Sequence, residues 1–195
     1  MRDQPVISRR MQRLNPLPEP DAAAREHSAR LSALLRDAIA AAGGALPFWR
    51  YMELALYAPG LGYYSAGAHK FGAAGDFVTA PELGGLFARC IADATVPVLR
   101  ELGSDAVFLE LGGGSGAFAE HALRRFAACD ALPARYAILE PSADLRERQR
   151  ERLAAMLPAE LGARVEWIDA PPQAAWSGVL FANEVLDALP TSRFV

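Results

Sequence analysis

The second half of the chain alternates between short apolar runs and longer amphipathic segments. Four runs of aliphatic and aromatic residues have the length of buried strands: 106–110, 136–140, 164–168 and 178–182. Between them, apolar residues recur at helical spacing, most clearly in the charged stretch from Asp144 to Leu157. Strands that alternate with helices predict a parallel, doubly wound, Rossmann-like α/β sheet.

The chain reaches its last residues just after the fourth of these strands. Arg193-Phe194-Val195 has the composition of the opening of a fifth strand. A doubly wound sheet usually has more strands and a further covering helix. We therefore expect a longer native protein, of which this chain holds strands 1–4 and the start of strand 5.

Helical and glycine-rich segments precede the predicted sheet. Residues 1–20, rich in arginine and proline, are predicted to be a disordered N-terminus. Residues 21–104 are predicted to form a helical segment that includes a glycine-rich loop. The remaining residues, 105–195, then form an incomplete cofactor-binding domain.

Turn and cap residues mark the limits of two early helices. Asp21 is a good N-cap, and apolar residues at helical spacing follow it as far as Gly43-Gly44, where the helix is expected to end. Pro47 is expected to open a second, shorter helix.

A third helix is predicted just before the sheet. Six apolar residues at helical spacing predict its buried face: Leu83, Leu86, Phe87, Cys90, Ile91 and Ala94. Thr79 and Glu82 match the capping-box pattern for its start, and Pro97 is expected to kink or end it. Cys90, among apolar neighbours, is interpreted as a packed core thiol.

Composition and charge exclude several classes of function. The net charge of -3 and the acidic pI of about 5.7 give no strongly basic surface for nucleic acid. Two cysteines and three scattered histidines provide neither a zinc spacing nor a disulfide framework, so we expect no metal and a reducing compartment.

The sequence also bears on location. No apolar run approaches the length of about 18 residues that predicts a membrane-spanning helix. The arginines near the N-terminus would suit a transit peptide and the mitochondrial matrix, but Asp3 and the weak apolar pattern favour a bacterial cytoplasm.

The glycine loop after the first predicted strand is the strongest local signal. Gly112, Gly114 and Gly116 let the backbone turn tightly and let a ligand lie against it at the carboxyl edge of the sheet. The loop also satisfies a relaxed dinucleotide fingerprint, so an NAD-type oxidoreductase remains an alternative. The close glycine spacing and Glu110 favour S-adenosylmethionine, because its ammonium group needs a counter-ion whereas a pyrophosphate would be repelled.

Acidic residues follow two further strands. Glu140 ends the second strand, where its carboxylate can accept both ribose hydroxyls of a nucleoside. Asp169 ends the third strand and could accept from the adenine amino group, although a plain surface carboxylate is an equally good interpretation.

Polar residues after the fourth strand indicate the acceptor side of the site. Asn183, Glu184 and Asp187 follow that strand, without the aromatic residue that often stacks a base or planar amide in N-methyltransferases. Carboxylates suit a cationic acceptor instead. An arginine guanidinium stays protonated, so its methylation is helped by Glu184 and Asp187 acting as catalytic carboxylates that orient it and accept a proton.

Four stretches together resemble one family, the MidA-like proteins, which include mitochondrial complex I assembly factor 7. The stretches are 57–64, 75–82, 109–116 and 182–190. The resemblance runs from about Leu31 to Val195, roughly the N-terminal half of a family member. It implies a class I methyltransferase fold and the methylation of arginine in a protein substrate, in the mitochondrial member a subunit of respiratory complex I.

The resemblance also assigns residues that spacing alone leaves open. It implies that the 75–82 stretch lies beside the cofactor. The residues concerned are Gly75, Asp76, Thr79, Pro81 and Glu82. A second alternative stays open, a catalytically silent assembly factor that retains only the cofactor pocket.

Overall fold

The computed structural model describes residues 19–65 and 80–194, and the predictions for residues 1–18, for Gly75, Asp76 and Thr79, and for Val195 lie outside these ranges. The helices and strands, in chain order, are α1 (Ala22–Ala41), α2 (Phe48–Tyr57), the 3-10 turn η1 (Ala80–Leu83), α3 (Gly85–Leu102), the turn η2 (Gly103–Asp105), β1 (Val107–Leu111), α4 (Ala117–Ala128), β2 (Arg135–Leu139), α5 (Ala143–Met156), α6 (Ala159–Gly162), β3 (Val165–Ile168), β4 (Gly178–Ala182) and the turn η3 (Leu186–Ala188).

The four strands form one parallel sheet in the order β3-β2-β1-β4. Val107 at the start of β1 pairs in register with Arg135 of β2 and with Gly178 of β4, so the carboxyl ends of these strands meet at one edge. The predicted α/β fold class and the four predicted strands are confirmed. Arg193 and Phe194, the described residues of the expected opening of a fifth strand, have no regular structure, and the Phe194 side chain is exposed.

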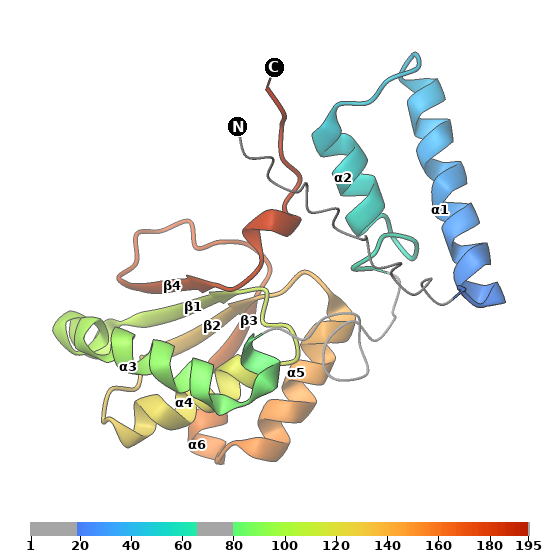
Figure 1. Cartoon of the computed structure of the whole chain (residues 1–195). Coiled ribbons are helices and arrows are strands. Elements are labelled where there is room, and N and C mark those ends of the chain that lie inside the picture. Colours follow the sequence, from blue (N-terminus) through green and yellow to red (C-terminus); the bar gives the residue numbers. More distant parts are fainter. Residues whose placement is uncertain (1–18, 66–79, 195) are drawn as a thin grey trace, which may run out of the picture.

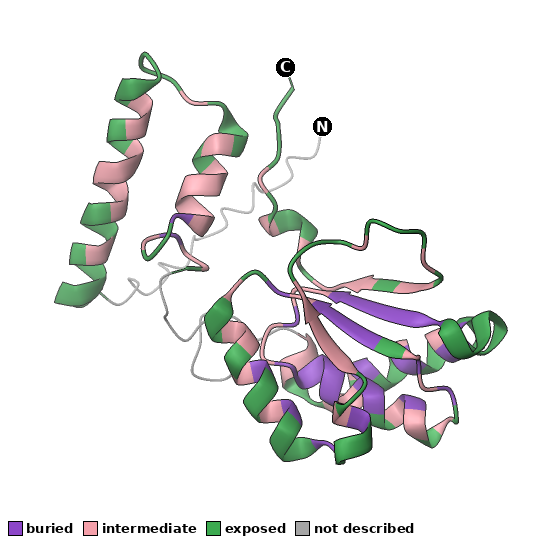
Figure 2. Cartoon of the chain, turned by 180° about the vertical axis from the view of Figure 1, so that it is seen from behind, coloured by how far each residue is buried: buried purple, intermediate pink, exposed green. Residues whose placement is uncertain are grey.

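Helices α3 to α6 lie together on one side of the sheet (Figure 1). Their apolar faces pack against alternate residues of the strands, above all Phe108 of β1 and Tyr136 of β2, whose rings stack with centroids 5.1 Å apart. Phe118 of α4 stacks on Phe181 of β4 at 4.0 Å. Burial is concentrated in the two central strands and in the helix surfaces that face them (Figure 2).

Helix α3 packs only two of its predicted apolar residues, Phe87 and Ile91, against the core. Ala88 and Ala92 are fully buried against α4, while Leu83 and Leu86 are 79% and 68% exposed. Small alanine side chains let the two helices approach closely, which favours the alanine face over the leucine face. The prediction of a packed core thiol was also wrong, because Cys90 is exposed.

The start and the end of α3 also differ from expectation. The helix begins at Gly85, with Gly84 as its N-cap, so the predicted capping box does not open it. The helix continues through Pro97 to Leu102. Pro97 lies on the exposed side, where water can satisfy the carbonyl group that loses its partner.

Helices α1 and α2 form a separate pair beside the sheet and its helices (Figure 1). The side chain of Asp21 accepts a hydrogen bond from the Ala24 amide at 2.7 Å, which confirms the predicted N-cap. Among the contacts of the pair with the rest of the molecule, the Tyr57 hydroxyl donates to the Ala188 carbonyl at 2.9 Å. Among the described helices, none has the length and apolar character needed to cross a membrane.

Candidate functional site

A cavity of about 910 Å³ opens at the carboxyl edge of the sheet. We call it the carboxyl-edge cavity. Residues from the ends of β1, β2 and β4 line one side, and Tyr57 and Tyr64 line another. Nine of the residues that the sequence singled out line it: Pro81, Glu82, Glu110, Gly112, Gly114, Glu140, Asn183, Glu184 and Asp187. In open α/β sheets, ligands bind at this edge.

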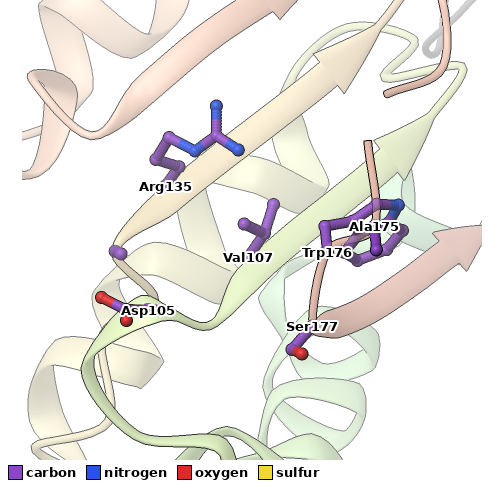
Figure 3. A pocket seen from close by; sticks show the side chains of 7 residues that line it. Asp105, Val107, Arg135, Ala175, Trp176 and Ser177 are labelled. Atoms are coloured by element: carbon purple, nitrogen blue, oxygen red, sulfur yellow. The ribbon is translucent and has the colours of Figure 1, made fainter. Parts of the chain in front are cut away.

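A second hollow, of about 530 Å³, lies at the opposite edge (Figure 3). Val107 and Arg135, which begin β1 and β2, line it together with Trp176 and Ser177, which precede β4. The Arg135 guanidinium donates to Glu166 at 2.9 Å and is therefore already paired. The hollow lies at the amino ends of the strands, away from the ligand edge of this kind of sheet, so the carboxyl-edge cavity is the better candidate.

The glycine loop requires glycine for steric reasons as well as for its backbone angles. Gly112, Gly114 and Gly116 all have positive φ, with values of 64°, 53° and 80°. A Cβ atom on Gly112 would lie 2.8 Å from Cγ2 of Val185. The loop is thus shaped to pass close to its neighbours, and it presents Gly112 and Gly114 to the cavity, while Gly116 is the N-cap of α4.

Glu82 is held against the glycine loop. The hydroxyl of Ser115 donates to the Glu82 carboxylate, which joins η1 to the loop between β1 and α4. Glu82 and Pro81 therefore lie beside the loop and line the cavity. The sequence suggested a capping role for Glu82, whereas the structure gives it a contact 33 positions away.

Glu110 is a buried acid at the base of the cavity. Only 2% of the residue is exposed, and its carboxylate accepts a hydrogen bond from the Tyr136 hydroxyl at 2.7 Å. Burial raises the pKa of Glu110 from 4.5 to about 7; the bond from Tyr136 opposes this rise, and the charge of Glu140 adds to it. A positively charged ligand group beside Glu110 would offset both the cost of burying its charge and the repulsion from Glu140.

Glu140 is also buried, and hydrogen bonds fix its carboxylate on two sides. The Ser142 amide donates to one oxygen at 3.0 Å, and the Gln149 amide group lies 3.5 Å from the other. Burial raises the pKa of Glu140, and the hydrogen bonds from Ser142 and Gln149 limit that rise by favouring the ionised form. The arrangement holds an acceptor at the cavity wall, as a ribose-binding carboxylate requires.

Asp169 lies outside this set of cavity residues. Its side chain is 89% exposed and accepts from the Arg146 guanidinium at 2.7 Å. Arg146 also donates to the Ile168 carbonyl at 2.9 Å and to the Glu140 carbonyl. The structure therefore brings Asp169 to the end of β3 as expected, but joins it to α5 rather than to the cavity.

Glu184 has an unusual backbone conformation at the cavity wall. Its φ of 52° lies in the left-handed region, which non-glycine residues seldom adopt and which is often found at functional sites. Asn183 precedes it at the end of β4, and Asp187 follows in η3. All three line the cavity, so the polar residues after β4 are brought together as the sequence predicts.

Two tyrosines face these acidic residues from α2 and the segment after it. The rings of Tyr57 and Tyr64 stack with centroids 5.5 Å apart. Burial raises the pKa of Tyr57, with further contributions from Tyr64, Glu140 and Asp187. Burial and the charge of Asp187 likewise raise the pKa of Tyr64. Sequence reasoning quoted the 57–64 stretch as part of the resemblance but assigned no role to these rings.

The cavity residues fit S-adenosylmethionine. The backbone at Gly112 and Gly114 leaves room for close approach of a ligand, and the cavity volume lies within the usual range for small-molecule sites. Glu110 and Glu140 supply two buried carboxylates, which suit the cationic and hydroxyl groups of that molecule and would repel a pyrophosphate. Within the described ranges, no group of three or more His, Cys, Asp or Glu residues could hold a metal ion.

The strand order, the glycine loop after β1 and the acidic residues at the carboxyl edge are those of a Rossmann-like α/β enzyme. A family of S-adenosyl-L-methionine-dependent methyltransferases matches residues 90–195, more than half of the chain. The protein belongs to this family.

Two curated proteins are similar to this chain in sequence. Both are named protein arginine methyltransferase NDUFAF7 homolog, mitochondrial. The Drosophila melanogaster protein is 34% identical over 113 residues, 56% of this chain and 25% of the relative. The Caenorhabditis elegans protein is 29% identical over 199 residues, 91% of this chain and 46% of the relative. The chain thus spans less than half the length of these relatives.

Two crystal structures of COG1565 superfamily proteins from Burkholderia thailandensis resemble the fold. One, bound to S-adenosyl-homocysteine, has 48% sequence identity and a TM-score of 0.82, and the match covers 90% of this chain and 46% of that one. The other, a native structure, has 46% identity and a TM-score of 0.74, covering 90% and 44%. Both matches cover a larger share of this chain than residues 90–195, which the family match covers.

Proposed function

We propose that the protein transfers a methyl group from S-adenosylmethionine to an arginine side chain of a protein substrate. The observation that carries the proposal is the acidic lining of the carboxyl-edge cavity. Glu110 and Glu140 lie on its glycine-loop side, and Glu184 and Asp187 lie on the β4 side. A site with carboxylates on both sides suits a cationic donor and a cationic acceptor at once.

The donor would lie on the glycine-loop side. Gly112 and Gly114 would let the backbone approach it, Glu140 would accept from the ribose hydroxyls, and Glu110 would face its amino group. Pro81 and Glu82 would close the same side, together with Gly75, Asp76 and Thr79 from the preceding segment. We retain Asp169 as an adenine contact only if Arg146 releases it.

When bound, S-adenosylmethionine supplies a methyl group on a sulfonium sulfur that is already a good leaving group. The task of the protein is then to position the acceptor nitrogen and to neutralise charge. Glu184 and Asp187 would orient the guanidinium and accept its proton, with Asn183 beside them on the cofactor side. Tyr57 and Tyr64 would cover this side and exclude water.

The names of the two curated relatives support arginine as the acceptor and a protein as the substrate. The family resemblance adds a subunit of respiratory complex I as a candidate substrate. We propose the bacterial cytoplasm as the location, with the mitochondrial matrix as the alternative that the relatives' names suggest.

A methyl-transfer assay tests the proposal. The protein, expressed from its complete reading frame, is incubated with radiolabelled S-adenosylmethionine and a peptide array in which arginine or lysine is the only cationic residue. We expect label on arginine peptides alone. Asp187→Asn should lower kcat at least tenfold, whereas the matched change Asp37→Asn, at an exposed position of α1, should leave kcat within twofold.

The other possible results of this assay separate the acceptor, the activity and the role of Asp187. Label on lysine would refute the choice of acceptor but not the methyltransferase. Cofactor binding without any labelled protein, in the presence of extracts as well as peptides, would favour a silent assembly factor. Equal effects of the two aspartate substitutions would remove Asp187 from the catalytic carboxylates.

A further inference from the structure

Gln149, on α5, is the most fully buried polar side chain near the carboxyl-edge cavity. No part of it is exposed to solvent, although it does not line the cavity. Burial of an amide side chain is costly unless its hydrogen-bonding groups find partners. The partners of Gln149 come from three different elements, so the residue joins parts of the cofactor site that no strand or helix connects.

Both polar atoms of the Gln149 amide have suitable hydrogen-bond partners. Its nitrogen donates to the Gly114 carbonyl at 2.9 Å and lies 3.5 Å from the Glu140 carboxylate. Its oxygen accepts from the Trp167 indole at 2.8 Å. Because an indole N–H can only donate, and a carbonyl or an ionised carboxylate can only accept, these partners allow one orientation of the amide.

The glycine loop also packs closely against the Gln149 side chain. A Cβ atom on Gly113 would lie 3.0 Å from the Gln149 amide nitrogen, and a Cβ atom on Gly116 would lie 3.4 Å from the Gln149 Cα atom. A Cβ atom at Gly113 would crowd Gln149, whereas at Gly116 the contact is ordinary and the positive φ of 80° is what disfavours a larger residue. Gly113 and Gly116 therefore both lie against Gln149, and Gly113 also lines the cavity together with Gly112 and Gly114.

Taking the proposed function as its basis, we infer that Gln149 is a positioning residue that sets Glu140 and the glycine loop for binding of the cofactor ribose. It acts through Glu140, because its nitrogen lies against one carboxylate oxygen while the Ser142 amide holds the other. The carboxylate is thereby fixed in one rotamer. Gln149 acts on the loop through its hydrogen bond to the Gly114 carbonyl, which fixes the orientation of that peptide group beside the cavity.

A double-mutant cycle distinguishes positioning from general support of the core. Binding of S-adenosylhomocysteine is measured by titration calorimetry for the wild type, Gln149→Met, Glu140→Gln and the double variant, with melting temperatures for each. Methionine matches the shape of glutamine but makes none of the three hydrogen bonds. We expect Gln149→Met to weaken binding at least tenfold in the wild type, but no more than about threefold when Glu140 is already changed.

Trp167→Phe is the matched control. It removes the partly buried hydrogen bond from the indole to the amide oxygen but leaves both contacts of the amide nitrogen, so binding should stay within about threefold of the wild type. If Gln149→Met does not fold, Gln149→Leu replaces it. Leucine has neither a donor nor an acceptor, and it should also weaken binding at least tenfold.

The inference is overturned if Gln149→Met binds like the wild type, or if it weakens binding by the same factor in both backgrounds. It is also overturned if Trp167→Phe weakens binding as strongly as Gln149→Met. Failure of the folded wild type to bind S-adenosylhomocysteine would instead refute the proposed function on which the inference rests.

Discussion

Glu110→Gln exchanges the buried acid for a neutral side chain of the same shape. The glutamine carbonyl can still accept the hydrogen bond from Tyr136, so the packing around the site is preserved. Only the ability to ionise is lost. The substitution therefore isolates the effect of one buried charge on the free energy of unfolding and on ligand binding.

The magnitude follows from the raised pKa of Glu110. An acid with a higher pKa in the folded protein than in the unfolded chain binds its proton more tightly when folded. Its contribution to stability is fully present below pH 4.5 and is lost as the pH rises from 4.5 to about 7. At about 1.36 kcal/mol per pH unit, the wild type loses about 3 kcal/mol over this window, and Glu110→Gln does not.

Urea denaturation of the ligand-free protein at pH 4.5 and pH 8 measures this difference. We expect Glu110→Gln to gain about 3 kcal/mol over the wild type between the two pH values, and to bind S-adenosylhomocysteine at least about tenfold more weakly. Tyr136→Phe is the opposing control: it removes a bond that lowers the pKa of Glu110, so the loss at pH 8 should grow. A stability difference that does not change with pH, or one that shifts in favour of the wild type at pH 8, would refute the reasoning.

Three further substitutions test the geometry of the site and the core. Gly112→Ala should lower stability by about 1–3 kcal/mol and weaken binding of S-adenosylhomocysteine, because the new Cβ would clash with Val185 and alanine disfavours the positive φ of this position. An unchanged affinity in titration calorimetry would contradict this. Tyr57→Phe should cost about 1 kcal/mol by removing the bond to Ala188, seen as a lower melting temperature that an unchanged scan would rule out. Phe108→Ala should cost about 3–5 kcal/mol in urea denaturation, and a loss below about 1 kcal/mol would mean that Phe108 is not central to the core.

The sheet could be predicted from sequence because its strands carry a strong local signal. Each of the four strands is a short apolar run bounded by polar or turn residues, and each lies within one residue of its predicted limits. A sheet with helices packed on it buries its central strands, so those strands need apolar residues, and the apolar runs in the sequence therefore identify them. The two N-terminal helices were predicted from their caps for the same local reason.

Helix α3 shows where the local signal fails. Periodicity gives weight to large apolar residues, and it selected Phe87 and Ile91, which pack against the core, but also Leu86, which is exposed. The true packing face carries Ala88 and Ala92, because α4 approaches closely on that side. How closely a neighbouring helix can approach depends on residues more than 20 positions away, and the sequence of α3 alone does not contain that information.

The site was predictable to the extent that it follows strand ends. Glu110, Glu140 and Asn183 stand at the carboxyl ends of three adjacent strands, so topology alone brings them to one edge. Gln149 gives no such signal. It lies within a charged helix, and only its buried contacts with the glycine loop and Trp167 distinguish it from the polar residues around it.

The contact between Tyr57 and Ala188 joins positions 131 residues apart and closes one side of the carboxyl-edge cavity. During synthesis, α2 leaves the ribosome long before η3, and contacts of such separation form late because a long loop must first be ordered. A nascent chain can therefore display its glycine loop without a closed pocket. The Tyr57 side of the cavity can therefore close only after the chain has been synthesised as far as Ala188.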